Sequence, residues 1–184
     1  MNQNQLIDTK KLLDASYMDN DKAKQHLAER NFKLDEELSG KRGKVFLDGE
    51  GKPNVVFAGT KNRHDVINDV KIMLGFKDKS KRLKHSKKLV QDVKNKYGQD
   101  VKTLGHSYGG YLAEKSNKGG KVVTYNKLAM VHTQKKNKNQ IDIRTSNDIA
   151  SLLSGKNKQI TLKSKSYNPL VAHSTKSLKS QNIR

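Results

Sequence analysis

The spacing of apolar residues changes several times along the 184-residue chain, and each spacing predicts a different element. In the first thirty residues, leucine and alanine recur at helical intervals on both sides of a polar break at 19–21, which predicts two helices. Helical spacing returns in three later segments, at 65–74, 81–97 and 109–115. Short runs rich in β-branched residues predict strands at 44–47, 54–58, 101–104, 121–125, 141–144 and 159–162.

The order of these elements predicts an α/β fold. Asp, Gly and Pro residues between 48 and 53 predict a hairpin that joins the first two strands. From residue 101 onward, strands alternate with helical or turn segments, which is typical of a mostly parallel sheet covered on both faces. We therefore expect one compact α/β domain over residues 1–184, with an antiparallel hairpin at one edge. Residues 1–38 should form a mainly helical segment, and the Ser/Lys-rich tail at 174–184 should fray.

Composition excludes several classes of protein. The chain has no cysteine, which excludes disulfide scaffolds, cysteine zinc sites and thiol chemistry. No apolar run approaches the roughly 18 residues of a membrane-spanning helix, and the N-terminus lacks the basic-then-apolar order of a secretory signal. These features predict a soluble protein that is cytoplasmic or virion-associated.

The charge of the chain is strongly positive, with 38 Lys and Arg against 18 Asp and Glu, a formal net charge of +20. Such a field attracts polyanions, namely nucleic acid, anionic lipid headgroups or an acidic protein surface. A competing interpretation is compositional, because Lys and Asn are abundant everywhere, including in the polar segment 134–140. Charge alone does not decide between these interpretations.

The stretch that indicates chemistry reads Gly105-His106-Ser107-Tyr108-Gly109 and lies between a predicted strand and a predicted helix. A Gly-x-Ser-x-Gly sequence in this context is typical of a nucleophile elbow, a sharp turn that lifts the serine hydroxyl clear of the sheet. The small flanking residues Gly105 and Gly109 avoid collisions within the turn. The turn also directs the backbone N–H of Tyr108 at the reacting oxygen, as one donor of an oxyanion hole.

A serine nucleophile needs a base and an acid that orients the base, and in this architecture they follow in the order acid, then histidine. The chain after Ser107 has two histidines, His132 and His173, and three carboxylates, Glu114, Asp142 and Asp148. Glu114 lies in the elbow helix and Asp142 inside a strand, whereas Asp148 follows a strand end, where α/β proteins gather catalytic groups. Only His173 comes after Asp148, so we predict a Ser107, Asp148 and His173 triad.

Simpler interpretations compete with this triad. Asp148 has the chemistry to cap a short helix, and His173 is also consistent with an ordinary surface histidine in the predicted loop 168–174. His106, beside the nucleophile, is expected to pack rather than to react. The remaining histidines show no ligand-like grouping with carboxylates, so no metal site is predicted; they are His26, His64, His85 and His132.

The chain resembles the class 3, or fungal-lipase-like, lipases of the α/β-hydrolase superfamily. The resemblance runs from about residue 55 to 173 and rests on the elbow, on the strand run that ends in Gly59-Thr60, on the Asp-rich helix start at 65–70 and on the segment 144–149. It implies an α/β-hydrolase fold and assigns Thr60 as the second oxyanion-hole donor. The chain departs from the family pattern at four positions, with Ala58 for the usual Arg, Val66 for Trp, Tyr108 for Leu and Ala150 for Pro.

The resemblance implies hydrolysis of acylglycerols or phospholipids by acyl transfer, with no cofactor. Together with the positive charge, it predicts a phospholipase-like activity on anionic membranes. The segment between Thr60 and the elbow has one bulky apolar cluster, at 72–76, so we expect little or no lid, although core packing is an alternative role for that cluster. Two other classes remain open: a catalytically silent α/β-hydrolase fold with a structural or virion role, and a basic nucleic-acid-binding protein. The latter is less favoured because few aromatic residues interleave the lysines. No oligomeric state is predicted.

Overall fold

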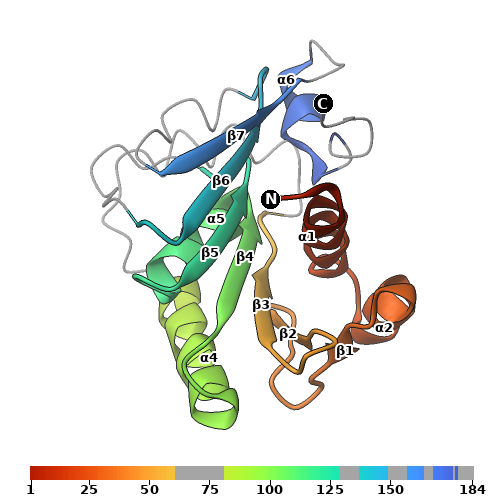
Figure 1. Cartoon of the computed structure of the whole chain (residues 1–184), viewed down its shortest axis with the longest axis vertical. Coiled ribbons are helices and arrows are strands. Elements are labelled where there is room, and N and C mark those ends of the chain that lie inside the picture. The colour runs from red at the N-terminus through yellow and green to blue at the C-terminus, as the bar shows by residue number, and fades with distance from the viewer. Residues whose placement is uncertain (61–80, 129–136, 149–156, 164–167, 176, 178–184) are drawn as a thin grey trace.

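The computed structural model describes residues 1–60, 81–128, 137–148, 157–163, 168–175 and 177, which form a single-domain α/β fold (Figure 1). Within these residues, seven strands lie in one sheet in the order of the sequence. The strands are β1 (Lys33–Leu34), β2 (Lys44–Leu47), β3 (Pro53–Phe57), β4 (Lys102–His106), β5 (Lys121–Tyr125), β6 (Gln140–Thr145) and β7 (Lys158–Leu162). β1, β2 and β3 pair antiparallel, and β3 to β7 are all parallel. The expected mostly parallel sheet with an antiparallel hairpin at one edge is confirmed.

Helices cover both faces of this sheet (Figure 1). α1 (Gln3–Ala15) and α2 (Asn20–Leu27) pack on one face, and α4 (Lys81–Tyr97) and α5 (Tyr108–Ser116) pack on the other. A 3₁₀ turn follows α2 (Ala28–Arg30), and the short α6 (Pro169–His173) lies near the C-terminus. The polar break predicted at 19–21 marks a helix start, because the Asp19 side chain accepts a hydrogen bond from the backbone N–H of Lys22. None of the described helices is long and apolar enough to cross a bilayer.

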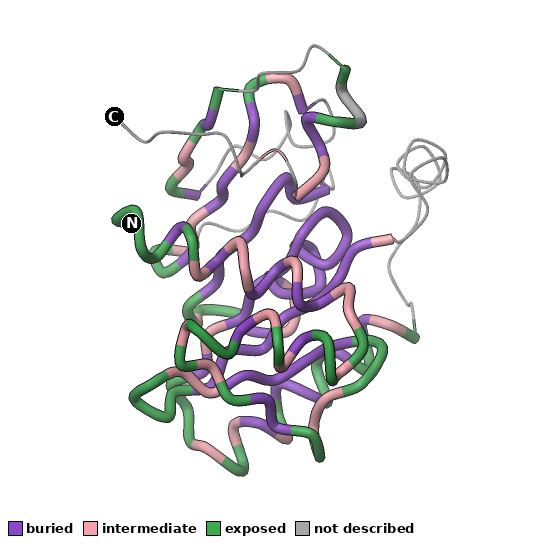
Figure 2. Tube along the Cα trace, turned by 90° about the vertical axis from the view of Figure 1, so that its right-hand side faces the viewer, coloured by how far each residue is buried: buried purple, intermediate pink, exposed green. Residues whose placement is uncertain are grey.

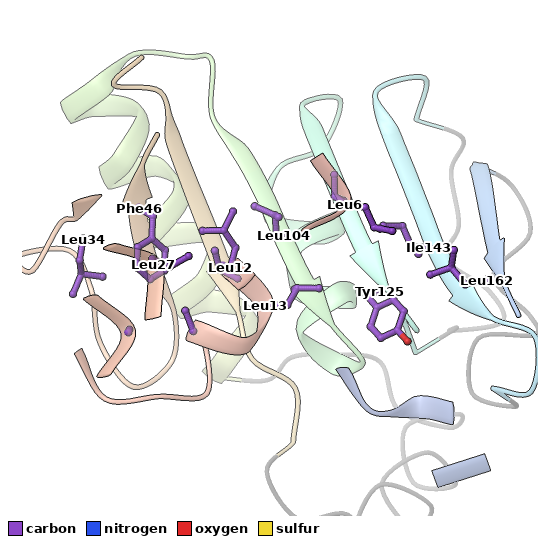
Figure 3. Close-up of a cluster of buried hydrophobic side chains, with 14 residues drawn as sticks. Leu6, Leu12, Leu13, Leu27, Leu34, Phe46, Leu104, Tyr125, Ile143 and Leu162 are labelled. Carbon is purple, nitrogen blue, oxygen red and sulfur yellow. The ribbon is translucent and has the colours of Figure 1, made fainter. Parts of the chain in front are cut away.

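Alternation along the strands divides the core into two layers. On β3, Val55 and Phe57 face α4 and α5, whereas Val56 faces α1. Figure 3 shows the layer under α1 and α2, in which Leu12 and Leu13 lie over the sheet. Both leucines are fully buried, and the central strands are buried along most of their length (Figure 2). The two layers hold the central strands in place, and the predicted site residues Thr60, Ser107 and Asp148 follow the carboxyl ends of β3, β4 and β6.

Several expectations fall on residues outside this description. They are the helix at 65–74 with its Asp-rich start, the apolar cluster at 72–76 that bears on a lid, His64, His132, Ala150, and most of the tail after residue 174.

Candidate active site

Ser107 occupies the sharp turn between β4 and α5. Its backbone φ is 55° and its ψ is −124°, a conformation that residues with a side chain rarely adopt. Three backbone hydrogen bonds hold it there: the Ser107 N–H donates to the carbonyl of Tyr125 at 3.1 Å, and its own carbonyl accepts from Gly110 at 3.0 Å and Leu128 at 3.2 Å. Such strain persists only where the surroundings enforce it, and it is common at reactive residues.

The two glycines that flank Ser107 sit where no side chain fits. A Cβ on Gly105 would lie 2.1 Å from the carbonyl oxygen of Gly109, and a Cβ on Gly109 would lie 2.1 Å from the carbonyl oxygen of Phe57. Both obstacles are backbone atoms, which cannot rotate away. Close backbone approach across the elbow therefore requires glycine at both positions.

The segment that follows β3 lies directly beside Ser107. A Cβ on Gly59 would lie 3.0 Å from the Cβ of Ser107, so the Ala58–Thr60 loop is in van der Waals range of the elbow. Arg82, from the first turn of α4, donates a hydrogen bond to the Ala58 carbonyl at 2.8 Å, and its guanidinium lies 4.9 Å from the centre of the Tyr108 ring. Thus Arg82 supplies a hydrogen bond to Ala58, at the position where the class 3 lipases that the motifs resemble have an arginine in the sequence. Sequence reasoning did not find Arg82, because α4 reaches this loop only in the folded chain.

His173 and Asp148 are 25 residues apart in the sequence but form a hydrogen bond in the folded chain. His173 Nδ1 lies 2.8 Å from Asp148 Oδ1, and the two residues are only 6% and 2% exposed. Because a carboxylate accepts, Nδ1 carries the proton, which leaves the lone pair of a neutral ring on Nε2. Nε2 is buried and has no hydrogen-bond partner among the described residues. The structure shows no bond from this nitrogen to Ser107, and such bonds are often long until substrate is bound.

His173 is not in a loop, as its sequence context predicted, but is the last residue of the short helix α6. Pro169 begins this helix, a position where its missing N–H costs nothing. Five residues are too few to show a helical period in the sequence, which explains the wrong prediction.

Asn126, just past the carboxyl end of β5, fixes α6 to the sheet. Its side-chain N–H₂ donates to the carbonyls of Ala172 at 2.9 Å and His173 at 3.1 Å, and its Oδ1 accepts from the Thr145 N–H at 2.9 Å. One buried amide thus connects the ends of β5 and β6 to the helix that carries His173. The sequence offered only the position of Asn126 at a strand end as a signal.

Glu114 and Asp142, the other two carboxylates after Ser107 in the sequence, take part in a different set of contacts. Lys127 lies between them, 2.6 Å from Glu114 and 3.1 Å from Asp142, in a buried cluster on the α5 side of the sheet. Burial by itself raises the pKa of Glu114, but the adjacent Lys127 charge and hydrogen bonds outweigh it and hold that pKa below its ordinary value. Asp142 also accepts from the Thr124 hydroxyl at 2.6 Å. Both carboxylates therefore serve the ion-pair cluster. No group of three potential metal ligands occurs in the described part of the chain.

Comparison with known proteins adds a family to this geometry. Residues 5–151 match a phospholipase-like family, the Tle-like phospholipase domain. The match covers most of the chain, including Ser107 and Asp148 but not His173, and it does not single out the class 3 lipases that the motifs resemble. No curated protein and no solved structure matches the chain. A match of this extent supports a hydrolase that acts on lipid esters, and the chain belongs to the Tle-like phospholipase domain family.

Proposed function

We propose that this domain hydrolyses carboxylic esters of phospholipids, with Ser107 as nucleophile, His173 as general base and Asp148 as the acid that orients the base. The contact that carries the proposal is the buried hydrogen bond between His173 Nδ1 and Asp148, which leaves Nε2 as a basic nitrogen. The strained Ser107 turn is the second support. The sequence alone predicts the same three residues, Ser107 from its motif and Asp148 and His173 from their order along the chain.

In the proposed reaction, Ser107 Oγ attacks the ester carbonyl while His173 Nε2 takes the hydroxyl proton. Asp148 keeps the imidazole in the required tautomer and stabilises the cation that forms. The backbone N–H groups of Thr60 and Tyr108 stabilise the oxyanion, a contribution worth about 10²–10³-fold in rate for each donor. The imidazolium then protonates the leaving alcohol, and a water molecule activated by His173 releases the fatty acid and restores Ser107.

Labelling with a fluorophosphonate probe tests this proposal directly, because the probe forms a covalent bond only with an activated serine. The wild-type protein should be labelled at one equivalent, and Ser107→Ala should not be labelled. Ser116→Ala is the matched control, since Ser116 lies at the end of the same helix and its hydroxyl donates to the Ala113 carbonyl. Failure of the folded wild-type protein to react would instead favour a catalytically silent domain.

The exposed face of α4 supports an anionic membrane as the place where the substrate is met. Several of its lysines are exposed in the first turns of the helix, on both sides of Arg82 in the sequence, and Arg82 itself contacts the loop beside Ser107. These exposed residues are Lys81, Lys84, Lys87 and Lys88. Each lysine near an anionic bilayer adds about 1 kcal/mol of attraction. Lys88 is paired with Asp92 at 2.7 Å, so the attraction that would orient the site toward the lipid surface comes mainly from the other three.

We expect hydrolysis of phosphatidylcholine vesicles to accelerate at least about tenfold when a third of the lipid is replaced by phosphatidylglycerol, and the gain to disappear in 0.5 M salt. Replacing Lys84 and Lys87 together by glutamine should remove most of the gain without changing turnover of a soluble short-chain ester. Equal rates on both vesicles would contradict membrane attraction. Tight, salt-sensitive DNA binding without esterase activity would point to the nucleic-acid alternative.

A further inference from the structure

A continuous set of hydrogen bonds joins the loop after β3 to the helix that carries His173. The backbone N–H of Gly59 donates to the hydroxyl of Tyr17 at 2.8 Å. That hydroxyl lies 2.6 Å from Nδ1 of His106, and Nε2 of His106 lies 2.7 Å from the carbonyl oxygen of His173. These three bonds connect residues from the end of α1, the end of β3, the elbow and α6.

The hydrogen-bond partners determine which atom carries each proton in this series. A carbonyl oxygen can only accept, so Nε2 of His106 must carry a proton and donate to His173. In a neutral ring Nδ1 is then the acceptor, and the Tyr17 hydroxyl must be its donor. The same hydroxyl oxygen accepts from Gly59. All donors therefore point in one direction, from the loop beside Ser107 to the backbone of His173.

The surroundings keep both side chains in these protonation states over a wide pH range. Burial, reinforced by the neighbouring His173, lowers the pKa of His106 to about 3, and burial raises the pKa of Tyr17 to about 12. The His106 ring packs in contact with three others, 5.0 Å from His173, 5.7 Å from Tyr125 and 5.9 Å from Tyr17 between ring centres. A neutral, packed imidazole of this kind transmits position rather than protons.

We propose that Tyr17 and His106 are positioning residues that set the oxyanion loop and the catalytic histidine at a fixed spacing on either side of Ser107. This inference rests on the proposed function, because it concerns the groups that the hydrolysis uses. Gly59 directly precedes Thr60, and the His173 carbonyl belongs to the base itself, so the series ends on the two parts whose placement the reaction requires. Geometric errors of about 1 Å in such groups can cost about 100-fold in rate.

Tyr17→Phe removes one oxygen atom and leaves both the Gly59 N–H and His106 Nδ1 without their bond. We expect kcat for a short-chain aryl ester to fall about 10- to 100-fold while KM changes less than about twofold, because substrate contacts remain and only the alignment is lost. Tyr97→Phe is the matched control. Its hydroxyl also makes a 2.6 Å hydrogen bond, to Asp35 at the far end of α4, and its loss should leave kcat unchanged.

Nitrogen NMR of the His106 ring tests the series without reference to activity. The wild-type spectrum should show a neutral ring protonated at Nε2 from pH 5 to pH 9, and Tyr17→Phe should change the Nδ1 shift. A ring protonated at Nδ1 would overturn the inference whether or not the protein is an enzyme. If the wild type reacts with a fluorophosphonate and Tyr17→Phe reacts as fast, the positioning role is wrong. If the wild type does not react with the fluorophosphonate but its His106 ring is protonated at Nε2, the proposed function fails and the hydrogen-bond series stands.

Discussion

Replacing His173 by alanine should reduce kcat for a short-chain aryl ester by on the order of 10⁴-fold or more, with the fold intact. The serine hydroxyl then has no base to take its proton, and Asp148 has no imidazole to orient. Residual turnover would come from the oxyanion donors and substrate binding alone. The measurement is steady-state turnover of purified protein, with circular dichroism to verify folding.

Asp148→Asn should fall between His173→Ala and the wild type in kcat, because the ring stays in place but its proton is no longer fixed on Nδ1. His85→Ala provides the matched control, since His85 lies exposed on α4. Turnover by His173→Ala equal to that of the wild type would exclude His173 as the base and leave His132 as the other histidine after Ser107.

Local patterns predicted the elements of this fold well where each element has enough residues to show a period. The strand at 121–125 and the helix at 81–97 have the bounds observed for β5 and α4. The two-residue β1 was missed, and α6 was expected as a loop, because neither is long enough to reveal its spacing. The alternation of strands and helices predicted a mostly parallel sheet, and β3 to β7 are parallel, whereas the order of the strands within the sheet was not predicted.

The candidate site also contains residues that the sequence predicted and residues that it did not. Ser107 was predicted from a motif, and Asp148 and His173 from their order along the chain; the structure places the latter two in contact. Tyr17, Arg82 and Asn126 were not foreseen, because what they do depends on contacts that tertiary packing creates. Tyr17, for example, meets His106 across a separation of 89 residues, and no spacing rule spans that distance. Chemistry-bearing residues have sequence signatures, whereas the groups that hold them in place do not.

Replacing Gly109 by alanine should destabilise the whole domain. The added Cβ would lie 2.1 Å from the Phe57 carbonyl oxygen and 2.8 Å from the carbonyl carbon of Ala58, both backbone atoms of the neighbouring strand and loop. Relief requires β3 and α5 to separate at the point where Gly59 meets Ser107. We expect the free energy of unfolding to fall by at least about 3 kcal/mol, at the upper end of overpacking effects. Urea denaturation followed by circular dichroism measures the change.

Gly40→Ala separates this steric effect from the general consequences of replacing glycine. Gly40 has an ordinary φ and no atom within 4 Å of an added Cβ, so the substitution should be neutral or slightly stabilising. If Gly109→Ala unfolded at the same urea concentration as the wild type, the elbow would have to be looser than the contact between Gly109 and Phe57 implies. A loose elbow would not hold Ser107 at a φ of 55°, so that result would also remove the backbone strain as support for Ser107 as the nucleophile.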